Sequence, residues 1–301
     1  MTSAGSASQA PGGTITLAGR QVARVGFGAM QLGEVRGRET PSKETAIAVL
    51  RAAVDSGVNH IDTAEFYGPG TANQRIREAL HPYSRELVLV SKVGARHDST
   101  AGLVLAQRPE ELRASVEANL STLKAERLDV VNLRRTDSPP GLVAEGDQLV
   151  DLDSQLAELI ALRDEGKIGG IGLSAVDADQ VRQALPAGIV CVQNSYSALD
   201  RSSEAVLDVC REHDIAWVPF FPLGSAFPGF AKVSEHPVVV EIAASLGATP
   251  AQVGLAWLLA SYPRTLLIPG TSDPAHLREN VAAGEVHLLP EMVESIAGLN
   301  Q

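Results

Sequence analysis

The segment LDVVNLRRTD, residues 128–137, has the pattern of a buried strand that ends in charge. Its apolar part is rich in β-branched residues, which favour strands, and Arg134 and Arg135 follow at once. Seven further apolar runs, each closed by polar residues or glycine, recur along the chain: VGFGAMQ (25–31), VNHIDTAEFY (58–67), LVLVSKVG (87–94), GGIGLSA (169–175), VCVQNSY (190–196), AWVPFFPLG (216–224) and TLLIPGTS (265–272). The chain therefore contains eight candidate strands.

Helical stretches separate most of these runs. PSKETAIAVLRAAVDSG (41–57) has Ser42 three residues before Thr45 and Gly57 at its end, the pattern of a capped helix. RPEELRASVEANLSTL (108–123) and DSQLAELIALRDEGK (153–167) follow later runs, and the second has a leucine-rich stripe. Alternating strands and helices over roughly 250 residues predict a (β/α)8 TIM barrel. The alternative, a doubly wound open sheet, would place a GxGxxG loop after its first strand, and GFGAMQLG does not fit.

The two ends of the chain add elements to this barrel. TITLAGRQVARVG (14–26) predicts an N-terminal β-hairpin, while TPAQVGLAWLLAS (249–261) and LPEMVESIAGL (289–299) predict extra C-terminal helices. We expect residues 1–13 to be a flexible tail and residues 14–301 to form one domain, because no internal stretch has the composition of a linker. DSPPGLVAEGDQ (137–148) and SAFPGFAKVSEHP (225–237) are candidate substrate loops.

The charge balance excludes several classes of partner. The net charge of the 301 residues is −11, without a basic tract, which argues against nucleic acid and against anionic membrane surfaces. Neither of the two cysteines has metal-ligand or redox spacing. We expect a cytoplasmic protein, a monomer or weak homo-oligomer, with a small-molecule substrate and no metal site.

Charged and polar residues gather where the predicted strands end. In a (β/α)8 barrel these ends meet at the face that carries the active site, and here they bring Asp62, Tyr67, Lys92 and Arg134. A lysine ammonium lowers the pKa of a nearby tyrosine, and a paired aspartate holds the lysine in place. Such a tyrosine can donate a proton, as carbonyl reduction requires. Taken singly, Asp62 and Lys92 would be read as a structural salt bridge; the set together favours a site.

The motifs around these residues resemble those of the aldo-keto reductase superfamily from about Thr14 onward. The resemblance implies catalytic roles for Asp62, Tyr67 and Lys92, and a nicotinamide carboxamide held by Ser174 and Gln193. It also implies an aromatic ring, Phe220, stacked on the nicotinamide, and an adenosine-phosphate site in IPGTSDPAHLREN (268–280). The full set of cofactor-binding residues that it implies is Gly28, Met30, Asp62, Ser174, Gln193, Phe220, Phe221, Leu223, Gly270, Thr271, Ser272, His276, Arg278 and Asn280.

Three residues depart from the superfamily pattern around the cofactor. Ala175 stands where asparagine is frequent, and Gly270 and His276 stand where many members have lysine and arginine. The last two weaken the preference for NADPH over NADH. We expect NADPH, with Arg278 able to reach its 2′-phosphate, and NADH as the alternative. Without the resemblance, Arg278 is equally well read as an exposed helix charge.

Arg134 occupies the position where the superfamily usually has its catalytic histidine. The residue permits three interpretations: a non-catalytic nucleotide-binding module, a structural arginine paired with Asp129 or Asp137, or a reductase in which arginine polarises the carbonyl. We favour the third, because a guanidinium is always charged and can also hold an anionic oxygen beside an aldehyde. The segments DVVNLR, CVQN and VPFFPLG are similar to those of bacterial pyridoxal reductases, which predicts reversible reduction of pyridoxal to pyridoxine. Another carbonyl, in a sugar or natural-product intermediate, is the alternative substrate.

Two neighbouring residues receive structural interpretations. Arg135 follows Arg134 and faces the opposite way if the strand continues. His97 lies in KVGARHDST, which we expect to be a solvated loop.

Overall fold

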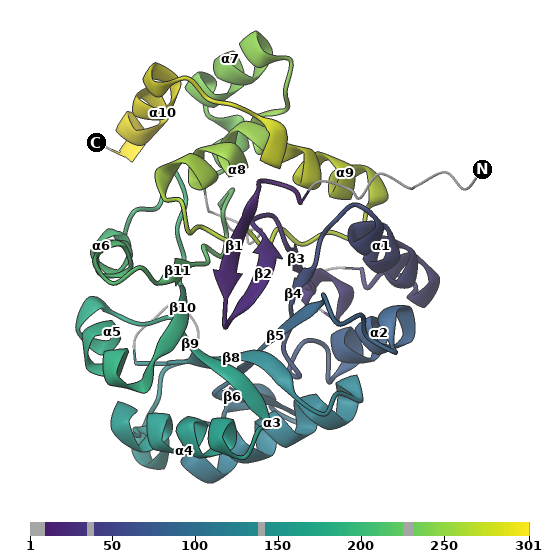
Figure 1. Ribbon diagram of the computed structural model, residues 1–301, viewed down its shortest axis with the longest axis vertical. Helices are drawn as coiled ribbons and strands as arrows, with labels where there is room; N and C mark the ends of the chain where they lie inside the picture. The colour runs from purple at the N-terminus through teal and green to yellow at the C-terminus, as the bar shows by residue number, and fades with distance from the viewer. Residues whose placement is uncertain (1–9, 35–38, 138–141, 225–230, 301) are drawn as a thin grey trace.

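Seven parallel strands curl around a common axis in the computed structural model, which describes residues 10–34, 39–137, 142–224 and 231–300 (Figure 1). In spatial order they are β11 (Ala216–Trp217), β10 (Ile189–Gln193), β9 (Ile168–Ser174), β8 (Leu128–Arg134), β5 (Val88–Val93), β4 (His60–Asp62) and β3 (Phe27–Gly28). The eighth segment closes the ring through single parallel bridges from Leu267 to Val25 and from Thr265 to Trp217. The predicted (β/α)8 barrel is confirmed.

Helices surround the strands, as Figure 1 shows. The α-helices are α1 (Lys43–Asp55), α2 (Thr71–Leu80), α3 (Pro109–Leu123), α4 (Leu152–Asp164), α5 (Ala178–Ala184), α6 (Glu204–Glu212), α7 (Pro237–Leu246), α8 (Pro250–Ser261), α9 (Pro274–Ala282) and α10 (Pro290–Ala297). Short 3-10 turns are η1 (Met30–Leu32), η2 (Gly146–Gln148), η3 (Leu185–Ala187), η4 (Val233–Glu235), η5 (Ala283–Glu285) and η6 (Gly298–Asn300). Ser42 caps α1 by accepting a hydrogen bond from Thr45 N at 3.1 Å, as the sequence predicts.

The N-terminal hairpin covers the start of the barrel strands. It consists of β1 (Thr14–Leu17) and β2 (Arg20–Ala23) and lies in front of the barrel in Figure 1. Arg20 pairs with Asp129 near the start of β8 at 3.0 Å. The predicted tail divides into two parts: residues 1–9 lie outside the described chain, whereas Pro11 O and Gly13 O accept hydrogen bonds from the backbone that follows β2.

Side chains alternate along each strand between two apolar cores. The larger core lies between strands and helices and takes Ile61, Leu89, Val131 and Leu133. The smaller core lies inside the barrel, where Leu17 and Val22 of the hairpin meet apolar side chains of the strands: Val88, Val90, Val130, Cys191, Ala216, Val218 and Leu266. The barrel is therefore apolar inside at the hairpin end, and its buried polar side chains lie toward the other end.

A second hairpin follows β5. The sequence predicts a loop here, but β6 (Ala95–Asp98) pairs antiparallel with β7 (Gly102–Leu105), and His97 is exposed on it. Of the two candidate substrate loops, residues 138–141 and 225–230 lie outside the described residues. Among the described residues, no single helix has the length and hydropathy to cross a bilayer, and α7 and α8 pass that test only as a pair bent by 94°.

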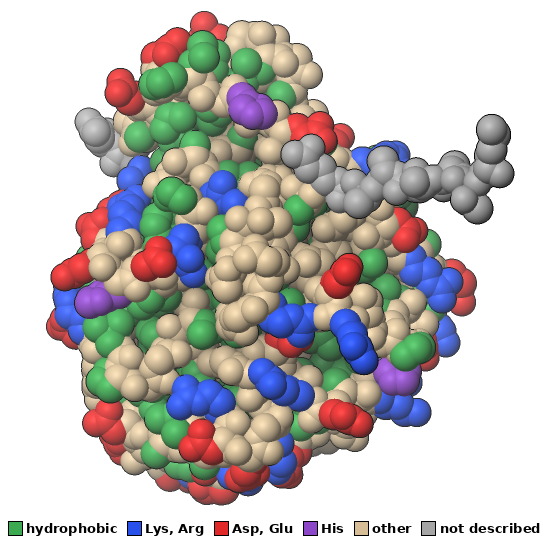
Figure 2. All heavy atoms as spheres, viewed as in Figure 1, with side chains coloured by type: hydrophobic (Ala, Val, Ile, Leu, Met, Phe, Trp, Pro, Cys, Tyr) green, Lys and Arg blue, Asp and Glu red, His purple; other side chains and the backbone are tan. Residues whose placement is uncertain are grey.

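On the face that Figure 2 shows, acidic and basic side chains are interspersed.

Candidate active site

A buried ion pair lies at the ends of two adjacent strands. Asp62 ends β4 and Lys92 lies on β5, and they are 2% and 6% exposed. Lys92 Nζ donates to Asp62 Oδ1 and, at 3.2 Å, to the carbonyl of Thr63. Gln193 Nε2 donates to Asp62 Oδ2 at 3.0 Å. The predicted pairing of Asp62 with Lys92 is confirmed, and Gln193 supplies a further donor to the carboxylate.

Tyr67 lies beside this ion pair. Lys92 Nζ is 5.0 Å from the centroid of the Tyr67 ring. Burial raises the pKa of Tyr67, although the charges of Lys92 and Arg134 both act to lower it. The sequence predicts the lowering by Lys92 but not the burial that outweighs it. Tyr67 is therefore protonated at neutral pH.

Lys92 remains an ammonium. Burial acts to lower the pKa of Lys92, but Asp62 and Tyr67 act in the opposite direction and the net pKa is raised. His60, two residues before Asp62 and 1% exposed, is a titratable group that the sequence reading did not single out. Burial lowers the pKa of His60 to about 4, so it is neutral, and its Nδ1 has no partner in the described structure.

Arg134 ends β8 with a guanidinium nitrogen that is buried and unpaired. Nη1 has no hydrogen-bond partner among the described residues. The two carboxylates that could make this arginine structural bind other arginines: Asp129 pairs with Arg20 at 3.0 Å, and Asp137 pairs with Arg135 at 2.6 Å. Burial lowers the pKa of Arg134, with Tyr67 acting against the shift, yet a guanidinium stays charged in proteins. Arg134 is thus a cation near Tyr67 with an open donor.

Arg135 has the structural role that the sequence predicts. Its Nε and Nη2 donate to the two oxygens of Asp137 at 2.8 and 2.6 Å. Its Nη1 donates to Val150 O at 2.9 Å and to Gln155 Oε1. Every nitrogen of this buried guanidinium is bonded, so it anchors the chain that follows β8.

The two residues expected to hold a carboxamide lie side by side. Ser174 ends β9 and Gln193 ends β10, they are paired in register, and both are almost fully buried. Gln193 Oε1 has no hydrogen-bond partner in the described residues, so it can accept from an amide NH2. Between Ser174 and α5 the chain passes through Ala175, which has a positive φ of 56°. Asn194 holds the next residue, Val176, through its amide at 2.7 and 3.1 Å.

The aromatic residues follow β11. Phe220 and Phe221 are half-buried, with ring centroids 5.1 Å apart and planes nearly perpendicular. Phe220 N donates to Asn194 O at 2.9 Å, which places this segment beside the end of β10. Leu223 is half-buried in the same stretch.

The predicted phosphate segment leads into α9. Thr271 Oγ1 accepts from Asp273 N at 3.0 Å, and Asp273 Oδ1 accepts from Ala275 N at 2.6 Å. The N-terminus of α9 therefore already carries a carboxylate, which the sequence reading did not anticipate. Arg278 and His276 are exposed on α9, and Ser272 and Asn280 are half-buried.

Two of the predicted glycines have a packing role. A Cβ on Gly270 would lie 2.5 Å from Gly28 O, so the first and eighth strands touch there through backbone alone. Met30, two residues after Gly28, begins η1 and is half-buried.

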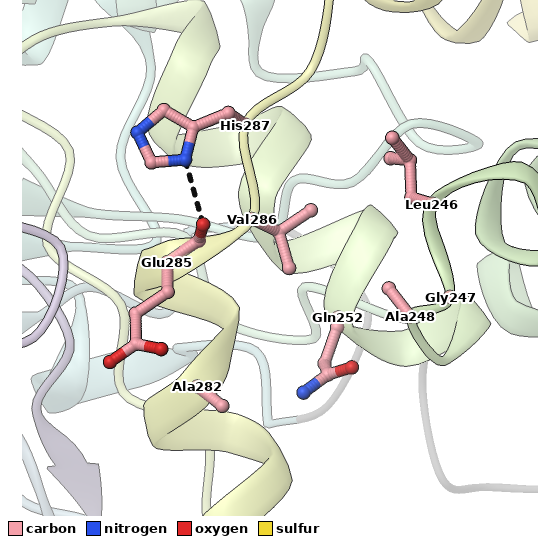
Figure 3. A pocket seen from close by; sticks show the side chains of 8 residues that line it. All are labelled: Leu246, Gly247, Ala248, Gln252, Ala282, Glu285, Val286 and His287. Carbon is pink, nitrogen blue, oxygen red and sulfur yellow. Dashed lines mark hydrogen bonds between the residues drawn. The ribbon is translucent and has the colours of Figure 1, made fainter.

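A cavity also lies away from the predicted site residues. It has a volume of about 290 Å³ and is formed by the end of α7, α8, α9 and η5 (Figure 3). Two of its polar side chains are hydrogen-bonded: His287 Nδ1 lies 2.7 Å from the backbone oxygen of Glu285, and Gln252 bonds Thr249 N and Glu279 O. It contains none of the predicted site residues. Within the described ranges, no three His, Cys, Asp or Glu side chains gather as a metal site.

Comparison with known proteins agrees with this geometry. The Aldo/keto reductase family model matches residues 24–301. Pyridoxine 4-dehydrogenase of Escherichia coli K12 is 46% identical over 290 residues, which is 96% of this chain and 98% of the relative.

Two solved structures share the fold. A thermostable aldo-keto reductase crystallised with the inhibitor epalrestat has a TM-score of 0.80 at 28% identity, covering 95% of this chain and 99% of that one. An aldo-keto reductase from Klebsiella pneumoniae in complex with NADPH has a TM-score of 0.76 at 26% identity, covering 94% and 93%.

Proposed function

Because the chain belongs to the aldo/keto reductase family, an oxidoreductase family, we propose that it reduces pyridoxal to pyridoxine with NADPH, in a reversible reaction. The proposal of substrate is supported by the 46% identity to pyridoxine 4-dehydrogenase over nearly the whole of both chains. Cofactor choice is supported by a relative solved with NADPH. The two buried free cysteines fit a cytoplasmic protein, and we further propose a monomer or weak homo-oligomer.

The observation that carries the substrate proposal is the open donor of Arg134. Its Nη1 is buried without a partner among the residues that the structure describes, and leaving a buried cationic donor unpaired is costly. A substrate with a negative oxygen next to its aldehyde would offset that cost by accepting a hydrogen bond from Nη1. Pyridoxal has an ionisable hydroxyl ortho to its aldehyde, so its oxygen and carbonyl together match one guanidinium.

In this proposal each group of the site has one task. Bound NADPH would supply the hydride to the carbonyl carbon. Tyr67, kept protonated by burial, donates a proton to the carbonyl oxygen. Lys92, charged and fixed on Asp62, stabilises the tyrosinate left behind. Arg134 binds the ortho oxygen and stabilises charge that develops on the reacting oxygen.

The residues proposed to hold NADPH fit its chemistry. The unpaired Gln193 Oε1 and the adjacent Ser174 suit the carboxamide, and Phe220 offers an aromatic face. Gly28, Met30, Phe221 and Leu223 would line the remaining path. We assign the adenosine phosphate to the segment from Gly270 to Asn280, with Thr271, Ser272, His276 and Arg278 within it.

The test is replacement of Arg134 by alanine, assayed through NADPH absorbance. We expect kcat/KM for pyridoxal to fall by about a hundredfold or more, the usual loss when a charge-stabilising donor is removed. For benzaldehyde, which lacks the ortho oxygen, the loss should be at least about tenfold smaller, because only the polarising contact disappears. Equal losses on both aldehydes would exclude the anion-holding role.

Two other functions give different results in the same assay. A reductase of another carbonyl would turn over NADPH with some aldehydes but not pyridoxal. A non-catalytic NADP(H)-binding module would bind NADPH in a fluorescence titration and reduce no aldehyde. The buried Asp62–Lys92 pair beside Tyr67 favours an enzyme over a binding module, since nucleotide binding alone does not need a proton donor.

A further inference from the structure

The main-chain carbonyl of Arg134 is held by a side chain that lies behind the site. Gln107, just before α3 and 2% exposed, donates from Nε2 to Arg134 O at 2.9 Å and to Gly94 O at 2.6 Å. Gly94 follows β5 two residues after Lys92. One amide group thus joins the strands that carry Lys92 and Arg134, just beyond the end of their ladder.

Gln107 is itself held in one orientation by Gln155 of α4. Gln155 is fully buried, and its Nε2 donates to Gln107 Oε1 at 2.9 Å and to Gln107 O at 2.7 Å. Gln155 Oε1 accepts from Arg135 Nη1. Since every polar atom of both amides is paired, neither can rotate without leaving a buried group unsatisfied.

The peptide of Arg134 is confined from a second side. Gly94 has a φ of +106°, and a Cβ there would lie 2.3 Å from Arg134 O. The carbonyl of Arg134 therefore rests directly against the backbone of Gly94 while Gln107 binds it. By contrast, Nη1 of the same residue has no partner among the described residues, so no hydrogen bond at that atom fixes the guanidinium, and the position of the Arg134 backbone matters all the more.

We propose that Gln107, supported by Gln155, is the positioning residue for Arg134: it sets the backbone from which the guanidinium reaches the substrate. This inference rests on the proposed role of Arg134 in polarising and binding the aldehyde. Gln107 is not among the residues proposed to contact the substrate or the cofactor. Small displacements of a polarising group lower the rate by large factors. Loss of the Gln107 hydrogen bond to Arg134 O should therefore reduce kcat, because the Arg134 guanidinium is displaced.

A double-mutant cycle tests the dependence on Arg134. Gln107→Leu, Arg134→Ala and the double variant are compared with the wild-type enzyme, using NADPH and pyridoxal. Gln107→Leu should lower kcat/KM by about tenfold or more, mainly in kcat, while the Kd for NADPH stays within about twofold. In the Arg134→Ala background the same change should cost less than about twofold.

Asn59→Leu is the matched control. It removes an amide that also bonds a backbone carbonyl and a backbone N–H, those of Gln21 and Ala23 in the N-terminal hairpin, at the opposite end of the barrel strands from Arg134. It should leave kcat/KM unchanged despite lost stability.

Gln107→Glu supplies a second readout. An ionised carboxylate in place of the amide would face Arg134 O and Gly94 O without a donor, whereas its protonated form can donate to one of them. The activity of this variant relative to wild type should therefore rise as pH falls. If the activity of Gln107→Glu relative to wild type stays low at every pH, hydrogen-bond donation from position 107 to Arg134 O is not what positions Arg134.

The inference and the proposed function fail separately. Absence of pyridoxal turnover by the wild type would remove the substrate proposal, and the cycle would then be run on any aldehyde that the wild type reduces. A Gln107→Leu effect that persists in full in the Arg134→Ala background, or no effect at all, would overturn the positioning role.

Discussion

Replacing Lys92 by methionine should destabilise the fold, and replacing its partner Asp62 by asparagine should make the stability depend on pH. Lys92→Met leaves the Asp62 carboxylate, 2% exposed, with only the Gln193 amide as donor. Breaking a buried pair by removing one partner costs about 3–5 kcal/mol. With an unfolding entropy of about 2.1 cal/mol/K per residue, or about 0.6 kcal/mol/K for this chain, the Tm should fall by about 5–8 °C.

The direction of the pH dependence follows from which charge remains. In Asp62→Asn the buried Lys92 loses the partner that raises its pKa, and burial then lowers it. Stability of that variant should rise with pH toward about 10, where an unfolded lysine titrates.

Urea unfolding followed by tryptophan fluorescence measures these changes, because Trp217 and Trp257 are both 1% exposed. Lys43→Met is the matched control, since Lys43 forms an exposed pair with Glu78 at 3.0 Å and should cost less than about 1 kcal/mol. A Lys92→Met loss no larger than the control, or an Asp62→Asn stability that does not rise with pH relative to the wild type, would refute the reasoning.

Three other changes probe the rest of the site. Tyr67→Phe should lower kcat by about a hundredfold to ten-thousandfold with NADPH binding retained. Because burial raises the pKa of Tyr67, wild-type kcat for reduction should not decline between about pH 7 and pH 9, and a decline centred there would contradict Tyr67 as the proton donor. Gly94→Ala should destabilise the fold by well over 2 kcal/mol, because the new Cβ would clash with Arg134 O. Its control is Gly102→Ala, where φ is +77° and no atom lies within 4 Å of the new Cβ, and which should cost only about 1–2 kcal/mol; equal shifts of the urea midpoint would argue against the clash. Asp273→Ser keeps a capping side chain on α9 and removes the carboxylate there, so the Kd for NADPH should improve by about two- to fivefold, with the Kd for NADH nearly unchanged; identical changes for both cofactors would place the phosphate elsewhere.

The barrel and the central ion pair could be read from the sequence because both depend on repeated or adjacent signals. Eight apolar runs with intervening helices leave few architectures, and Asp62 and Lys92 each terminate such a run. Strand ends were less predictable: in the run at residues 25–31 only Phe27 and Gly28 form a strand, Val25 makes a single bridge to Leu267, and η1 begins at Met30.

The parts that could not be predicted depend on long-range contacts between polar side chains. Gln155 lies within a leucine-rich helix, and nothing in the local pattern indicates that it bonds Gln107, 48 residues earlier. The prediction of a loop after β5 missed the β6–β7 hairpin, because ARHD (95–98) and GLVL (102–105) lack the alternation of polar and apolar residues that marks a half-buried strand. The pKa of Tyr67 depends on burial, which no motif reports.

The alternation of side chains along the strands has a consequence for how this protein can change. On β8, Val131 and Leu133 face the helices, while Val130 faces the barrel interior and Arg134 the rim. Mutations that improve packing and mutations that alter substrate preference therefore fall on different residues of the same strand. Directed evolution could first select stabilising substitutions among residues that face the helices. The added stability would then allow destabilising substitutions at the rim.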